Sequence, residues 1–392
     1  MRLGELVFCA SMTALAATAG PAQAQQVSPA APTAAPSLVS PEVMADRRVV
    51  FRVFAPKASS VLLGLQHAGT ASEPMTRDAA GVWSVTVGPL PPEIYNYNLI
   101  IDGVRTSDPA NLDMTGTQMS ATEFEVPGAP PRFDELQDVP HGSVNVHFYP
   151  SRAQHRQRPM AVYVPPQYYA EPGRKFPVLY LWHGANSMES AWVRSGRLAI
   201  ILDNLIAQKK AVPMIVVCPS NNVLIPVQGG TAGNAELLQA ELFDDLMPYL
   251  RQHYRVLDDR AHRAIAGLSA GAVTTLYIGM RRLEQFDYIG EFSAGIFGGS
   301  NGPAAQENRE SGGYSAERLA PGIYRRLLAP ATRPRVFWMS VGTEDPRLPY
   351  QQRALEDFKQ HGIQPLFRTY PGAHEWTVWR HSLADFAPLL FR

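Results

Sequence analysis

Cysteine is scarce in this 392-residue chain, which contains only Cys9 and Cys218. Cys9 lies in a segment with the features of a signal peptide, so the mature chain is expected to hold one thiol and no internal disulfide. Cys218 ends the apolar run 214–218. A catalytic cysteine needs an exposed, electropositive setting, and nothing in the sequence around Cys218 indicates one. We therefore interpret Cys218 as a buried structural thiol.

An excess of charge of one sign is also lacking, because 35 Lys and Arg residues balance 35 Asp and Glu residues. Net charge therefore gives no argument for nucleic acid or an anionic membrane surface as a partner. The sequence has no cluster of His, Cys and carboxylates at metal-ligand spacing, and we predict neither a metal nor an organic cofactor. Nothing in it predicts an oligomeric state.

Long apolar runs are missing after the N-terminus, so no later segment is predicted to span a membrane. At the N-terminus, Arg2 is followed by an apolar stretch, Leu6–Ala19, and by the small residues of Ala22-Gln23-Ala24. This pattern is typical of a signal peptide, residues 1–24, cleaved near Ala24. A membrane anchor is the alternative, but the stretch is too short and too rich in Ala and Thr. We predict an exported protein, periplasmic or secreted.

Composition then divides the chain. Residues 25–40 are rich in Ala, Pro, Ser and Thr and predict a flexible linker. Residues 41–127 show short alternating strands and a hairpin signal at Asp102-Gly103, which predict a small β-sandwich. Tyr95 and Tyr97 share one face of a strand, so either core packing or a surface for a sugar fits them. Residues 128–140, with Pro130 and Pro131, predict a second linker.

Residues 141–392 alternate buried strands with helices, which predicts a mostly parallel sheet covered on both faces, as in α/β-hydrolases. The strands are expected at 144–149, 161–164, 178–182, 214–218, 264–268, 336–341 and 366–370. Helices are expected at 198–208, 237–254, 353–361 and 376–391. Asp244 and Asp245 would lie on a solvated helix face. The stretch 298–322 is predicted to be a lid or a disordered loop.

A G-x-S-x-G motif, residues 267–271, overlaps the end of the strand 264–268, and this turn lifts a serine hydroxyl above the sheet in α/β-hydrolases. Ser269 is therefore the candidate nucleophile. In that fold the acid and the base follow in the chain, and Asp345 and His374 each come just after a strand. Spacing alone leaves Glu344 open as the acid. His381 falls inside the last helix, where a surface position is expected.

The oxyanion that forms during acyl transfer needs backbone amides already aimed at it. The residue after the nucleophile, Ala270, is one expected donor. The second is expected from the loop 183–186, with Ala185 as the favoured residue. His183 ends a strand just before Gly184, so it is expected to shape this loop rather than to act as a base.

The catalytic segment resembles the esterase D-like bacterial carbohydrate esterases, a group that includes feruloyl and acetylxylan esterases. Residues 51–56, 81–83, 89–92, 102–103 and 108–109 resemble the early-set, immunoglobulin-like module that precedes many such enzymes. The resemblance implies the triad Ser269, Asp345 and His374 and the donors Ala185 and Ala270. It departs at 219–222, where Pro-Ser-Asn-Asn replaces the usual Pro-Asn-Gly beside the acyl pocket. The matching catalytic stretches are 177–184, 190–192, 201–207, 213–217, 267–271 and 374–379.

Three tryptophans, Trp192, Trp376 and Trp379, are candidates to bind substrate, with core packing as the alternative. The resemblance implies a serine esterase acting on feruloyl or acetyl esters of plant polysaccharides. A siderophore-lactone esterase and an acyltransferase of the same fold stay open. From a different class, a carbohydrate-binding protein with an inactive hydrolase domain also stays open, although an intact triad argues against it.

Overall fold

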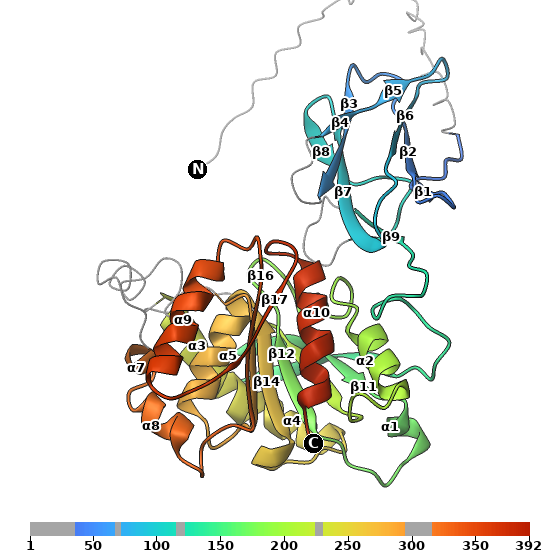
Figure 1. Ribbon diagram of the computed structural model, residues 1–392. Helices are drawn as coiled ribbons and strands as arrows, with labels where there is room; N and C mark the ends of the chain where they lie inside the picture. The colour runs from blue at the N-terminus through green and yellow to red at the C-terminus, as the bar shows by residue number, and fades with distance from the viewer. Residues whose placement is uncertain (1–35, 67–71, 115–121, 224–229, 295–315) are drawn as a thin grey trace, which may run out of the picture. The chain divides into compact units, whose positions relative to one another are not determined.

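The N-terminal domain of the computed structural model consists of two antiparallel sheets around one core (Figure 1). The structure describes residues 36–66, 72–114, 122–223, 230–294 and 316–392. The predicted signal peptide, most of the linker 25–40 and most of the stretch 298–322 lie outside these residues. One sheet holds β1 (Glu42–Val43), β2 (Val49–Phe54), β6 (Val82–Val87) and β5 (Thr76–Arg77). The other holds β4 (Glu73–Pro74), β3 (Val61–Gln66), β7 (Glu93–Ile101), β8 (Val104–Thr106) and β9 (Thr122–Val126).

Aromatic rings fill the space between these two sheets. Phe51 packs edge-on against Tyr97 and Phe124, with ring centroids 4.8 and 5.4 Å apart. Tyr95 stacks on Phe124. Both tyrosines are almost fully buried, which selects core packing over the surface for a sugar.

The second domain is built on one mixed sheet in the order β10-β11-β13-β12-β14-β15-β16-β17. The first two strands pair antiparallel at one edge, and from β13 onward the neighbours run parallel, as an α/β fold requires. The sequence-based prediction of the fold class is thus confirmed. The bounds are β10 Ser143–Ser151, β11 Arg156–Val164, β12 Val178–Trp182, β13 Ile215–Pro219, β14 Arg263–Leu268, β15 Tyr288–Phe292, β16 Val336–Gly342 and β17 Leu366–Tyr370.

Side chains of the central strands alternate between two apolar clusters, one on each face of the sheet. In β12, Tyr180 and Trp182 join the cluster under α3, α5 and α9, whereas Leu179 and Leu181 join the cluster under α2 and α10. Cys218 is buried in the second cluster, and burial raises the pKa of its thiol. The helices are α1 Gln167–Ala170, α2 Leu198–Ala207, α3 Gly230–Ala240, α4 Met247–His253, α5 Ala270–Arg281, α7 Ala316–Leu319, α8 Ile323–Leu328, α9 Leu348–Gln360 and α10 Trp376–Phe386, with short 3-10 turns at Arg260–His262 and Ala387–Leu389.

The helix predicted at 237–254 contains a π-helical segment, Glu241–Leu246, between α3 and α4. Of the two aspartates predicted on a solvated face, Asp244 is exposed as expected, whereas Asp245 is buried and accepts hydrogen bonds from the amide and guanidinium of Arg152. Glu241 likewise pairs with the buried Arg158 at 3.0 Å. These carboxylates hold the β10–β11 hairpin, which amphipathic spacing alone does not reveal. Within the described part of the chain, no helix has the length and hydrophobicity to cross a membrane.

Candidate active site

Ser269 lies at the turn between β14 and α5, and its backbone is held in an unusual conformation. Its φ is 54°, in a region that non-glycine residues rarely adopt. The Ser269 amide donates to the carbonyl of Phe292 on the neighbouring strand at 2.9 Å, which fixes the turn. A Cβ on Gly271 would lie 2.4 Å from the carbonyl oxygen of His183, so only glycine fits there. The motif therefore holds the serine hydroxyl clear of the end of the sheet.

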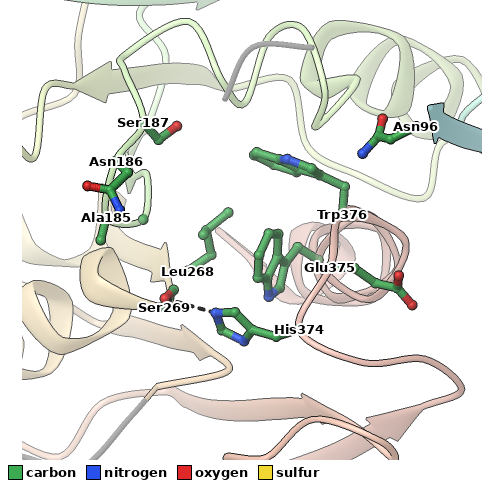
Figure 2. Close-up of a pocket in the computed structure, with 11 residues that line it drawn as sticks. Asn96, Ala185, Asn186, Ser187, Leu268, Ser269, His374, Glu375 and Trp376 are labelled. Carbon is green, nitrogen blue, oxygen red and sulfur yellow. Dashed lines mark hydrogen bonds between the residues drawn. The ribbon is translucent and has the colours of Figure 1, made fainter. Parts of the chain in front are cut away.

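The structure brings three predicted residues together above the sheet. The Nε2 atom of His374 lies 3.0 Å from Ser269 Oγ, and its Nδ1 atom lies 2.7 Å from Asp345 Oδ2. Figure 2 shows the imidazole facing the serine hydroxyl. Asp345 follows β16 and His374 follows β17, so parallel strands carry both to one edge. Glu344 is exposed, whereas Asp345 is buried against the histidine.

Asp345 is buried and yet held in its charged form. Burial alone would raise the pKa of this carboxyl, but the hydrogen bond and charge of His374 outweigh it, with help from the Arg347 amide and the Ser293 hydroxyl. The net effect places the pKa of Asp345 below its usual value of 3.8. A charged carboxylate on Nδ1 leaves Nε2 free to accept the serine proton.

Ser293 is a site residue that the motif analysis missed. It follows β15, has a φ of 54° and accepts a hydrogen bond from Trp379 Nε1 at 3.2 Å. Its own hydroxyl proton is thereby directed to Asp345. Trp379 in turn packs edge-on against His374, with ring centroids 4.9 Å apart. The position of Ser293 just past a strand, at the same edge as the triad, is the signal that could have found it.

The buried Glu291, on β15, lies two residues before Ser293. Its Oε2 accepts from the Ala294 amide at 2.9 Å and from Gln351 Nε2 at 3.0 Å. Burial raises the pKa of Glu291 to about 8, and the nearby charge of Asp345 adds to the shift. At neutral pH Glu291 is therefore protonated and places no second negative charge beside Asp345.

The loop after β12 lies close against the nucleophile. A Cβ on Gly184 would lie 2.8 Å from Leu268 Cδ1 and 3.2 Å from Ser269 Cβ. Ala185 lines the pocket above the serine, while Ala270 begins α5, where the first amides have no partner inside the helix. These are the two donors expected from the sequence.

His183 braces this loop from beneath. Its Nδ1–H donates to the Gly184 carbonyl at 2.7 Å, and its Nε2 accepts from the Asn221 amide at 2.9 Å. Burial lowers the pKa of His183 to about 4, so the ring is neutral, as an acceptor nitrogen must be. His183 lies away from the serine hydroxyl in this network and shapes the loop.

The segment 219–222, where the chain departs from the pattern of the family it resembles, makes the remaining braces. Asn222 Nδ2 donates to the Ser187 carbonyl at 2.7 Å. Asn221 Oδ1 accepts from Thr274 Oγ1 on α5 at 2.9 Å. The two asparagines thus tie the loop after β12 to α5.

A cavity of about 400 Å³ opens over Ser269 and His374. Two of the predicted tryptophans, Trp376 and Trp379, line it, and Figure 2 shows Trp376 above His374. Trp192 does not, because it is fully buried and donates its Nε1–H to the Trp182 carbonyl at 3.1 Å. It packs edge-on behind Trp376 at 5.4 Å and so supports the pocket wall.

Comparison with known proteins places this architecture in a family. The Esterase family model matches residues 151–390, more than half of the chain. The chain belongs to the Esterase family. Residues 39–113 match carbohydrate-binding module 48, the isoamylase N-terminal domain.

An endo-1,4-beta-xylanase/feruloyl esterase of Xylanibacter ruminicola is 30% identical over 362 residues, which cover 90% of this chain and 46% of the relative. The chain thus spans about half the length of that relative. A ferulic acid esterase of Anaeromyces mucronatus, solved with ferulic acid, is 24% identical, with a TM-score of 0.55 over 66% of this chain and 93% of the other. The enterobactin esterase of Shigella flexneri is 16% identical, with a TM-score of 0.62 over 87% of this chain and 92% of the other. Both solved structures share the fold.

Proposed function

We propose that this chain is an exported serine esterase that hydrolyses feruloyl or acetyl esters of plant polysaccharides. The observation that supports it most is the pair of contacts, 3.0 and 2.7 Å, that join Ser269, His374 and Asp345 below an open cavity. The feruloyl esterase activity named for the relative of Xylanibacter ruminicola supports the substrate class. Trp376 and Trp379 offer aromatic surface for part of such an ester.

The reaction follows from the contacts. His374 Nε2 takes the proton of Ser269 as Oγ attacks the ester carbonyl, and the oxyanion accepts hydrogen bonds from the Ala185 and Ala270 amides. The carbonyl re-forms as the C–O bond to the alcohol breaks, and His374 returns its proton to the leaving oxygen. Water then attacks the acyl-enzyme, His374 takes its proton, and Ser269 leaves protonated. Asp345 stays charged and stabilises the transient imidazolium.

The test is a panel of esters on the purified chain: methyl ferulate, an aryl acetate and a feruloylated oligosaccharide. Wild type should release acid from the ferulates, and Ser269→Ala should lower kcat by a factor on the order of 10⁶. A fluorophosphonate should label wild type and not the variant, which also separates an enzyme from an inactive binding protein. Release of acid by Ser269→Ala at the wild-type rate would refute the proposed nucleophile.

A catecholate trilactone of the siderophore type is a second candidate substrate. It is favoured by the enterobactin esterase, whose alignment extends over 87% of this chain. Time courses with the trilactone and with methyl ferulate distinguish the two, because the preferred substrate should have the higher kcat/KM.

A further inference from the structure

One residue of the N-terminal domain reaches the pocket of the catalytic domain. Asn96, on β7, lines the same cavity as Ser269 and His374. Figure 2 shows it beyond Trp376, on a strand separate from the rest of the site. Its side chain is half-buried, and within the described part of the chain it has no recorded hydrogen-bond partner. Residues 38–392, which include both domains, form one compact unit.

A buried arginine holds β7 in place. Arg380, on α10, is 2% exposed, and its Nη2 lies 2.6 Å from Glu93 Oε1, three residues before Asn96. Its Nε lies 2.8 Å from Asp134 Oδ2, and its Nη1 donates to the Ser195 carbonyl at 3.0 Å. Ion pairs at this depth fix geometry, because losing either partner leaves an uncompensated charge. The amide of Asn96 is thus presented from an anchored strand.

Beside the main cavity lies a small recess of about 20 Å³ that shares Asn96, Glu375 and Trp376 with it. The recess is polar: Glu123 and Glu375 supply carboxylates, and Asn96 supplies an amide. The cation that lines it, Arg380, is already held by Glu93 and Asp134. Glu123 is paired with Arg197 at 3.7 Å, which leaves the Glu375 carboxylate to accept hydrogen bonds from hydroxyl groups and to repel an anion.

The chemistry decides which half of the ester lies here. The leaving oxygen must come within reach of His374 Nε2, since that atom returns the proton. Glu375 and Trp376 directly follow His374, and Asn96 lies beyond them on the same side of the pocket (Figure 2). The oxyanion loop, with Ala185, lies on the other side. The alcohol half of the substrate therefore extends toward Asn96.

We propose that Asn96 is a specificity-determining residue that hydrogen-bonds a neutral sugar on the alcohol side of the ester. In this reading the N-terminal domain forms part of the substrate site. The inference rests on the proposed esterase function and adds the nature of the alcohol: a polyhydroxy group without charge.

The test compares two ferulates on the full chain, methyl ferulate and a feruloylated neutral arabinosyl oligosaccharide. Asn96→Ala and Asn96→Leu should each lower kcat/KM for the oligosaccharide about fivefold more than for methyl ferulate, as expected for one lost hydrogen bond. Leu keeps the size of Asn without its polar groups. Thr86→Ala, an exposed polar change on β6 of the same domain, is the control and should leave the ratio of the two substrates as in wild type.

An equal loss on both substrates, or no loss in either variant, overturns the inference. Full activity of Asn96→Leu with loss in Asn96→Ala also overturns it, since shape and not hydrogen bonding would then matter. Thermal unfolding of each variant checks that the domain contact survives. If wild type hydrolyses neither ferulate, the proposed function is wrong. This result comes from the wild-type protein alone and is therefore distinct from a failure of the inference about Asn96.

Discussion

Each domain buries an aspartate, and the two carboxylates differ in what surrounds them. Asp108, in the N-terminal domain, accepts from the Ser40 hydroxyl at 2.6 Å, the Tyr97 hydroxyl at 2.9 Å and the Ala110 amide at 2.9 Å. Every one of these donors keeps its proton. Asp345, in the catalytic domain, faces His374, which can gain a proton from Ser269.

The difference shows why burial and hydrogen bonding alone do not mark a catalytic carboxylate. Asp108 closes a network that ends in the core, so its contribution is to folding. Asp345 begins a network that ends at an exposed cavity, so in the proposed reaction it stabilises the charge that develops on His374. A change of Asp108 should therefore lower mainly the stability of the protein, and a change of Asp345 should lower mainly its activity.

Of the changes that test this comparison, the largest effect is expected on activity, at Asp345. Asp345→Asn should lower kcat for a ferulate ester by about 10⁴, because the amide no longer holds the imidazole in the productive tautomer. Steady-state kinetics measures this, and Glu344→Gln is the matched control, expected to keep wild-type rates because Glu344 is exposed. A large loss in Glu344→Gln with a small one in Asp345→Asn would exchange their roles.

At Asp108 the converse is expected. Asp108→Ala leaves two buried hydroxyl donors, those of Ser40 and Tyr97, without an acceptor and should lower the free energy of unfolding of the N-terminal domain by about 4 kcal/mol. Urea denaturation followed through the tyrosines of that domain measures it. Asp108→Asn should cost less, since the Ser40 and Tyr97 hydroxyls can rotate to suit an amide. A stable Asp108→Ala protein would show that this network is dispensable.

His183 sharpens the comparison from within the catalytic domain, since it is a buried polar group with a structural role. Its pKa is lowered from 6.5 to about 4. Below pH 6.5 His183 is therefore protonated in the unfolded chain, whereas in the folded chain it stays neutral until about pH 4. Stability from this group is complete above pH 6.5 and falls, by on the order of 3 kcal/mol, as the pH drops to 4. Unfolding midpoints between pH 7 and 4.5 should fall less steeply in His183→Gln; equal slopes would contradict the assignment.

Much of this site could be predicted from the sequence, because the fold fixes where residues that follow parallel strands must lie. Ser269, Asp345 and His374 each follow a strand, and parallel strands end at one edge. What failed has a physical cause. Trp192 is an aromatic residue of the kind that lines ligand pockets, but its burial depends on how Trp376 packs over it. The periodicity of the sequence does not predict that packing. The helical pattern predicts an exposed Asp245, because its partner Arg152 is far away in the sequence and the pattern does not include it.

Asn96 and Ser293 are harder to find from the sequence, because the position of Ser293 just past a strand is the single signal that it offers and Asn96 offers none. Asn96 lies in a different domain from the residues it joins, so no spacing rule connects it to Ser269. Ser293 has no motif, and its importance comes from a hydrogen bond with a tryptophan 86 positions later in the chain. Both depend on long-range packing, which is fixed only when the whole sheet has formed.

The smallest effect is expected at Ser293. A change there tests whether Ser293 acts on Asp345 through its hydrogen bond or only through packing. Ser293→Ala removes one donor that lowers the pKa of Asp345, so the pKa of that carboxyl should rise, which a ¹³C NMR titration of the carboxyl measures. At pH 7 the loss of kcat/KM should be about tenfold, the value of one hydrogen bond to a charged group. Ser382→Ala is the control: this buried serine bonds Ser340 and the Val378 carbonyl instead. A tenfold loss with an unchanged pKa of Asp345 would mean that Ser293 acts through packing, and that Asp345 depends on His374 and Arg347 alone.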